Sequence, residues 1–155
     1  MKKVLFICVH NSARSQMAEA FLKKYGAEYY TVESAGIEAG ELNPYVVQVL
    51  KEDEEIDISN NETKSAMDFY KHGKLFQYVV TLCDESSERC PIFPGIRERL
   101  IMNFKDPATF TGTEDEILNQ VRELKNHMKK DIHLFIDLEV NGKLRENMPS
   151  NWKIS

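Results

Sequence analysis

The stretch Val4-Leu5-Phe6-Ile7-Cys8-Val9-His10-Asn11-Ser12-Ala13-Arg14-Ser15 decides how this chain folds. Its first six residues form a continuous apolar run, which is typical of a strand covered on both faces. A short polar loop follows, and from residue 15 apolar side chains recur at helical spacing until Gly26. A strand, a short loop and a helix in this order predict the opening of a βαβ unit.

The rest of the chain continues this alternation. Further strands are predicted at 29–34, 75–82 and 99–103, and further helices at 43–50, 63–70 and 113–140. Thr113 and Glu116 have the spacing of a capping box at the start of the last helix. The pattern predicts an α/β fold, with a small four-stranded parallel sheet flanked by helices on both faces. Ligands of such a sheet bind at the carboxyl ends of its strands.

The size of the chain, 155 residues, suits one compact α/β domain. We expect this domain to span residues 1–140 and to be followed by a polar tail over residues 141–155. Trp152 lies in that tail and is a candidate to cover an apolar patch. We expect a monomer.

The net charge and the lengths of the apolar runs bear on the partners and the location of the protein. The net charge of −5 argues against nucleic acid and anionic membrane, because no global positive field attracts them. No apolar run approaches the roughly 20 residues needed to span a bilayer, and the apolar start is too short for a signal peptide. We therefore expect a cytoplasmic protein whose three cysteines are reactive, metal-binding or simply buried.

The loop after the first strand has the features of an anion cradle. Five residues separate Cys8 from Arg14, which lets the backbone amides of residues 9–14 curl around one anion. The helix N-terminus adds positive potential, and the Arg14 guanidinium can bind two oxygens of a tetrahedral anion. The same field should hold Cys8 as a nucleophilic thiolate, to which Ser15 can donate a hydrogen bond. The residues between them are Val9, His10, Asn11, Ser12 and Ala13.

The competing interpretation is that Cys8 is a small buried residue at the end of a strand. A cysteine followed six positions later by an arginine is common by chance, so the spacing alone is weak. The position of the pair, where the first strand ends and the first helix begins, favours the anion loop.

This segment resembles the signature Cys-x5-Arg-Ser of the low-molecular-weight tyrosine phosphatase superfamily. Read as CVHNSARSQMA, it is most similar to the thioredoxin-coupled arsenate reductases, and Gln16 stands where phosphatases usually have proline. The similarity continues through residues 33–36, 57–59, 79–83 and 106–107. The resemblance implies that Asp106 is a general acid, although an Asp-Pro pair alone is usually only a turn.

The resemblance also gives Cys83 and Cys90 a role as a redox pair. Two buried thiols or half of a zinc site are the alternatives, and the Cys-x6-Cys spacing does not suit zinc. In the implied reaction Cys8 attacks arsenate, and Cys83 then attacks the sulfur of Cys8. Cys90 attacks the resulting Cys8–Cys83 disulfide, and the Cys83–Cys90 disulfide that forms is reduced by thioredoxin. These steps require a movable segment around residues 83–93, and the flanking residues Pro91, Pro94 and Gly95 are compatible with motion.

Two functions compete with arsenate reduction. One is a protein tyrosine phosphatase, which would typically have aromatic residues directly after the Asp-Pro pair, where Ala108 and Thr109 stand. The other is a non-catalytic oxyanion-binding module, which leaves the cysteine pair unexplained. We expect no tightly bound cofactor.

Three features of the loop remain open at the level of sequence. Ala13 replaces a second loop cysteine that family reductases often have, and His10 replaces a small residue and is expected to face solvent. Some family members bind a monovalent cation near the loop asparagine, and Asn11, Glu19 and Ser34 match that arrangement loosely.

Overall fold

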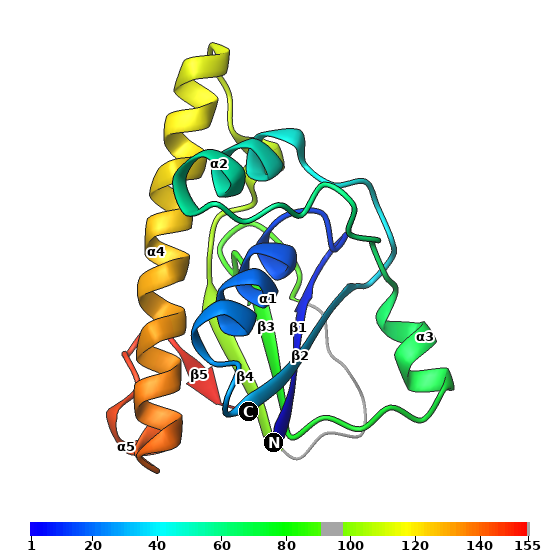
Figure 1. The fold of residues 1–155 in the computed structure, drawn as a ribbon, viewed down its shortest axis with the longest axis vertical. Helices are drawn as coiled ribbons and strands as arrows, with labels where there is room; N and C mark the ends of the chain where they lie inside the picture. The colour runs from blue at the N-terminus through cyan, green and yellow to red at the C-terminus, as the bar shows by residue number, and fades with distance from the viewer. Residues whose placement is uncertain (91–97, 155) are drawn as a thin grey trace.

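Helices and strands alternate along the chain as the sequence predicts. The computed structural model describes residues 1–90 and 98–154. The elements, in chain order, are β1 (Lys2–Cys8), α1 (Arg14–Tyr25), β2 (Tyr30–Gly36), α2 (Pro44–Glu54), α3 (Ala66–Lys71), β3 (Tyr78–Cys83), β4 (Glu98–Asn103), the 3-10 helix η1 (Pro107–Thr109), α4 (Glu114–Val140), α5 (Leu144–Asn147) and β5 (Lys153–Ile154) (Figure 1).

The sheet has the order β2-β1-β3-β4-β5. Strands β1 to β4 pair in parallel, which confirms the predicted α/β fold and its four parallel strands. The prediction of four strands in total is wrong, because β5 adds a fifth, antiparallel strand at the edge beside β4. Two residues of β5 in a polar segment carry too little periodicity to be recognised from sequence.

The two faces of the sheet are covered unequally. Helices α1, α2 and α4 lie together on one face, where they enclose the main core, and α3 lies on the other (Figure 1). Phe69 of α3 packs with Leu5, Ile7 and Val79 of the sheet in a second, smaller cluster. Helices therefore flank both faces, as predicted. In the part of the chain that the structure describes, no helix is long and apolar enough to cross a bilayer.

Side chains cap the starts of two helices, α2 and α4. The Asn43 side chain accepts hydrogen bonds from the Tyr45 and Val46 amides at the start of α2. Thr113 and Glu116 form the predicted capping box of α4. Both satisfy amides that a helix N-terminus leaves without intrahelical partners.

Residues 141–155 return the chain to the sheet. The side chain of Trp152 is 2% exposed and belongs to the main core. Its Nε1 lies 3.4 Å from Asp131 Oδ2 on α4, within hydrogen-bond reach. The division of the chain at residue 140 stays a prediction, but the tail contributes both β5 and this buried indole.

A buried carboxylate ties the end of α4 to the sheet. Glu139 accepts hydrogen bonds from the hydroxyls of Tyr30 and Tyr78, at 2.6 and 3.0 Å, and pairs with Lys2 of β1. Burial raises the pKa of Glu139, but the hydrogen bonds from Lys2, Tyr30 and Tyr78 outweigh it, so that the pKa lies below its usual value. The folded state thus favours the charged carboxylate.

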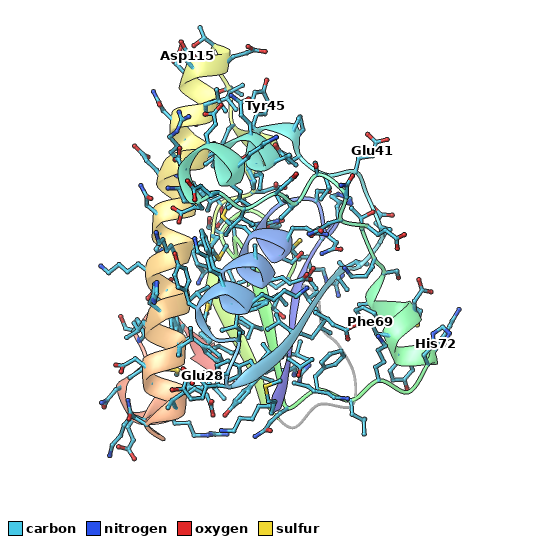
Figure 2. The ribbon with its side chains drawn as sticks, in the orientation of Figure 1. Glu28, Glu41, Tyr45, Phe69, His72 and Asp115 are labelled. Carbon is cyan, nitrogen blue, oxygen red and sulfur yellow. A yellow bond between two sulfur atoms is a disulfide. The ribbon has the colours of Figure 1, made fainter. Side chains whose placement is uncertain are left out.

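We expect Glu139→Gln to lower the free energy of unfolding by about 2 kcal/mol, because charge-assisted hydrogen bonds to two hydroxyls and an ammonium are weakened. Since the folded pKa is depressed, the contribution is present above the unfolded value of about 4.3 and is lost as the pH falls through the folded value. Urea denaturation at pH 7 and near pH 3 measures both effects. Glu41→Gln is the control, because Glu41 is exposed and points away from the body of the molecule (Figure 2). Equal stability losses from both substitutions would contradict the assignment.

Candidate active site

The loop of residues 9–13 joins β1 to α1 at the carboxyl ends of the parallel strands. The carbonyls of Cys8, Val9, His10 and Ser12 accept hydrogen bonds from the amides of residues 37, 38, 40 and 43. A planar trans peptide directs each carbonyl and the next amide to opposite sides. The amides of residues 9, 10, 11 and 13 are therefore directed away from the 37–43 segment, as an anion cradle requires.

A chain of hydrogen bonds leads to the sulfur of Cys8. Cys8 Sγ lies 2.9 Å from Ser15 Oγ, and Asn11 Nδ2 donates to the same Ser15 oxygen at 2.8 Å. Because Ser15 accepts from Asn11, its own hydrogen is free to point to Cys8. Cys8 is 3% exposed, and it is the free cysteine of the described residues. A hydroxyl in this position can donate a hydrogen bond to a thiolate, and the role expected for Ser15 stays a prediction.

Asn11 holds the loop in a conformation that few residues tolerate. Its φ of 56° lies in the left-handed region, which asparagine enters more readily than other non-glycine residues. Its Nδ2 also donates to Ser34 Oγ at 2.9 Å. Its Oδ1 accepts from Gln16 Nε2 at 3.1 Å and from the Lys64 amide at 2.8 Å. Asn11 is fully buried, so these bonds fix both its side chain and the loop backbone.

The loop can approach β2 closely because residue 36 is glycine. A Cβ placed on Gly36 would lie 2.6 Å from the Asn11 nitrogen and 2.7 Å from the His10 carbonyl carbon. Both are backbone atoms, which cannot rotate away as a side chain can. Any larger residue at position 36 must therefore displace the anion loop.

We expect Gly36→Ala to weaken binding of inorganic phosphate to the loop by about 100-fold, because displacements of about 1 Å have effects of this size on preorganised sites. Isothermal titration calorimetry measures the affinity, and circular dichroism checks that the variant folds. Gly73→Asn is the matched control, because a Cβ there meets nothing within 4 Å and asparagine tolerates its φ of 66°. Unchanged phosphate affinity of a folded Gly36→Ala protein would show that the close approach is unimportant.

The guanidinium of Arg14 is buried at the start of α1, with 3% of the side chain exposed. It donates to the Phe104 carbonyl at 3.1 Å and to both carboxylate oxygens of Glu88, with Nη2 3.1 Å from Oε2. Burial lowers the pKa of Arg14, but the hydrogen bond that it donates to Glu88 and the charges of Cys8, Glu88 and Asp106 raise it above its ordinary value. Arg14 is therefore a permanent cation beside Cys8.

Asp106 lies near the Arg14 guanidinium, just before η1. Its Oδ2 is 3.9 Å from Arg14 Nη2, and its Oδ1 accepts from the Ala108 amide at 2.9 Å. The side chain is 27% exposed, so water reaches it. The structure thus brings Asp106, Arg14 and Cys8 to one end of the sheet, as the sequence analysis expected.

Cys83 and Cys90 form a disulfide, with 5.8 Å between their Cα atoms. Strand β3 lies beside β1, with Ile7 opposite Thr81, so the register places Leu82 next to Cys8. Side chains alternate along a strand, and Leu82 belongs to the main core. Cys83 is therefore directed to the opposite face in this disulfide state. Pro91, Pro94 and Gly95, which the sequence analysis named for their effect on motion, lie outside the described residues.

The remaining loop residues differ in exposure. His10 is exposed, and its Nδ1 lies 3.2 Å from Glu38 Oε1. Ala13 is buried, and Val9 and Ser12 are half-buried. His10 thus faces away from the buried Cys8 and Ser15.

The residues suggested for a cation lie near one another, but they are already engaged. Ser34 accepts from Asn11, and Glu19 Oε2 accepts from Lys23 at 2.8 Å. Glu19 Oε1 is buried without a hydrogen bond, and Lys64 Nζ lies 3.9 Å from it. Among the described residues, no three His, Cys, Asp or Glu side chains cluster as metal ligands. The cation site stays a prediction.

Sequence reasoning missed two kinds of site residue. Glu88, the partner of Arg14, lies 74 positions away along the chain, and no local pattern connects the two. The Lys64 amide, which donates to Asn11 from 53 positions away, was missed for the same reason. Gln16 is only five positions from Asn11, but nothing in its residue type indicates that contact. For Glu88 the one available signal was an acidic residue inside the short segment between Cys83 and Cys90.

Comparisons with known proteins agree on one family. The family model described as "Low molecular weight phosphotyrosine protein phosphatase" matches residues 3–117. A curated relative named arsenate reductase from Halalkalibacterium halodurans is 40% identical over 136 residues, which cover 88% of this chain and 96% of the relative. Another arsenate reductase, from Bacillus subtilis, is 41% identical over 134 residues, 83% of this chain and 94% of the relative.

Solved structures give the same result. An arsenate reductase in the oxidised state matches with a TM-score of 0.68 and 27% identity, over 88% of this chain and 98% of that one. An arsenate reductase in a phosphate-binding state matches with a TM-score of 0.65 and 26% identity, over the same shares. A thioredoxin-dependent arsenate reductase from Corynebacterium glutamicum matches with a TM-score of 0.53 and 30% identity, over 86% of this chain and 63% of that one.

Proposed function

The chain belongs to the low molecular weight phosphotyrosine protein phosphatase family, and from this premise we propose that it is an arsenate reductase that uses Cys8 as nucleophile and a cysteine relay as the source of electrons. The observation that carries the proposal is the Cys83–Cys90 disulfide at the end of β3, the strand beside the anion loop. Hydrolysis of a phosphate ester requires no such pair.

The first step is the attack of Cys8 on arsenate. The amides of residues 9–14 and the Arg14 guanidinium hold the oxygens of arsenate. The Cys8 thiolate, stabilised by Ser15, forms a bond to arsenic, and the bond from arsenic to one hydroxyl of hydrogen arsenate breaks. Asp106 donates one proton to that hydroxyl, so that it leaves as water. The position of Asp106 beside Arg14 supports this role.

The second step reduces arsenic. Cys83 attacks Cys8 Sγ, a sulfur–sulfur bond forms and the sulfur–arsenic bond breaks. The electron pair of that bond stays on arsenic, which changes from +5 to +3 and leaves as arsenite. Because the disulfide state directs Cys83 to the opposite face from Leu82, this attack requires the end of β3 to change conformation.

The third step returns Cys8 to the thiolate. Cys90 attacks Cys83, the Cys83–Cys90 disulfide forms, and the electron pair of the broken bond returns to Cys8. The structure corresponds to the state after this step, with Cys8 free and the other two cysteines joined. Cys90 is half-buried rather than buried, so part of this residue is open to an external dithiol.

We further propose thioredoxin as that dithiol and the cytoplasm as the location. One relative of known structure is a thioredoxin-dependent arsenate reductase, and a cycle that begins with three thiols requires a reducing compartment. We assign the catalytic role to residues 1–140, which contain all six residues proposed for catalysis: Cys8, Arg14, Ser15, Cys83, Cys90 and Asp106.

A coupled assay tests the proposal. The full chain is incubated with thioredoxin, thioredoxin reductase, NADPH and arsenate, and oxidation of NADPH is followed by absorbance. We expect NADPH oxidation that depends on arsenate and on thioredoxin, with one arsenite formed per NADPH. Hydrolysis of an aryl phosphate without arsenate-dependent NADPH oxidation would instead favour the phosphatase alternative.

A further inference from the structure

Glu88 occupies the edge of the Arg14 guanidinium that Nη1 and Nη2 form, which is one of the edges that can bind an oxyanion. The two carboxylate oxygens of Glu88 accept from Nη1 and Nη2 of Arg14, in the forked geometry with which a guanidinium binds arsenate or phosphate. The Glu88 side chain is 16% exposed and Arg14 is 3% exposed, so water weakens this ion pair little. A bound oxyanion and Glu88 therefore compete for the same two N–H groups.

Residues 83–90, which the disulfide closes into a ring, hold Glu88 against Arg14. Glu88 is two residues before Cys90, and the disulfide links residues seven positions apart. The Asp84 amide donates to Glu88 Oε1 at 2.7 Å, and the Glu88 amide donates to the Asp84 carbonyl at 2.9 Å. Burial raises the pKa of Glu88, but the hydrogen bonds from Arg14 and the Asp84 amide lower it more, so that the carboxylate is charged.

We propose that Glu88 is an internal competitor of the oxyanion substrate, seated on Arg14 when the Cys83–Cys90 disulfide is closed and withdrawn when the disulfide is reduced. A dithiol converts the disulfide to two thiols and is itself oxidised to a disulfide. Reduction opens the ring of residues 83–90 and restores the conformational freedom that the ring removed. Glu88 then loses the constraint that directs it to Arg14.

The contact between Glu88 and Arg14 makes reduction of the cysteine pair precede binding of arsenate, and this interpretation rests on the proposed function. An enzyme in the disulfide state cannot reduce arsenate, because Cys83 and Cys90 have no electrons to give. Arsenate bound in that state would keep Cys8 in an unproductive complex. Glu88 prevents this by closing the anion site until the cysteine pair has been reduced.

Phosphate affinity in the two redox states tests the inference without requiring turnover. Inorganic phosphate is titrated calorimetrically into the full chain, either with the disulfide closed or after reduction by a dithiol, and thiol titration verifies each state. We expect the wild type to bind phosphate at least about tenfold more weakly when oxidised, as competition from a forked carboxylate implies. Glu88→Gln, which removes the charge and keeps the shape, should bring the oxidised affinity to within about threefold of the reduced one.

Glu85→Gln is the matched control. Glu85 lies in the same ring, but it contacts Asn103 and Lys153 rather than Arg14, so this variant should keep the wild-type difference between redox states. Equal phosphate affinity in both redox states of the wild type would overturn only the proposal that Glu88 competes with the oxyanion. The same holds if Glu88→Gln keeps the wild-type difference in phosphate affinity between the two states. If the protein binds no phosphate in the oxidised state and none in the reduced state, both this inference and the proposed function are overturned.

Discussion

Replacement of Cys83 by serine is expected to reduce arsenate-dependent turnover by at least about 10⁴-fold, the size of effect seen when an essential nucleophile is removed. A serine hydroxyl is not ionised near neutral pH, and it cannot form a disulfide with Cys8, so the electron pair needed to reduce arsenic has no source. Serine is close to cysteine in size, and the substitution therefore leaves the end of β3 packed.

The same variant should keep the chemistry that needs only the anion loop. Hydrolysis of an aryl phosphate by Cys8, Arg14 and Asp106 does not involve Cys83, and its rate should change by less than about threefold. Cys8→Ser is the comparison, because it should lose both activities. Arsenate turnover by Cys83→Ser at the wild-type rate, measured by NADPH oxidation with thioredoxin, would refute the relay. A parallel loss of both activities would indicate that Cys83 is structural.

The sequence predicted the parts of the site that are close together along the chain. The run of residues 4–15 contains a strand, an anion loop and a helix start, each with a strong local pattern, and the structure places them as expected. Cys83 could be placed near Cys8 because parallel neighbouring strands end at the same edge of a sheet. Local pattern and one rule of topology thus suffice to locate the candidate site.

Long-range contacts could not be predicted in this way. The pairing of Glu88 with Arg14 depends on the path of the chain after β3. Strand β5 depends on where α4 ends, because α5 and the turns around it must bring residues 153–154 beside β4. Trp152 shows the same limit: an indole in a polar segment can be exposed or buried, and only the position of α4 decides which. In each case the energy lies in contacts between distant segments rather than in local propensity.

Two residues that the proposed mechanism uses are engaged in other contacts in the disulfide state. In the proposed mechanism Arg14 binds the substrate, but in the structure it is paired with Glu88. The proposed mechanism also requires Cys83 beside Cys8, but in the structure Cys83 is bonded to Cys90. Both obstacles lie within residues 83–90, so a single rearrangement of this segment on reduction would remove them together. The disulfide state is therefore both the end of one cycle and a barrier to the start of the next.

Replacement of Cys90 by serine is expected to convert a multiple-turnover enzyme into one that releases a single arsenite per chain. Without Cys90 the reaction proceeds through the attack of Cys83 on Cys8 and stops at the Cys8–Cys83 disulfide, since no internal thiolate remains to break it. Arsenite measured after rapid mixing should show a burst of about one equivalent, followed by a steady state at least about 10³-fold slower than that of the wild type. Mass spectrometry of the quenched protein should find the peptides of Cys8 and Cys83 linked.

Arg89→Gln, a change at the exposed neighbouring position, should turn over normally. A steady-state rate for Cys90→Ser equal to that of the wild type would mean that thioredoxin reduces the Cys8–Cys83 disulfide directly, and that the Cys83–Cys90 disulfide in this structure is not part of the cycle.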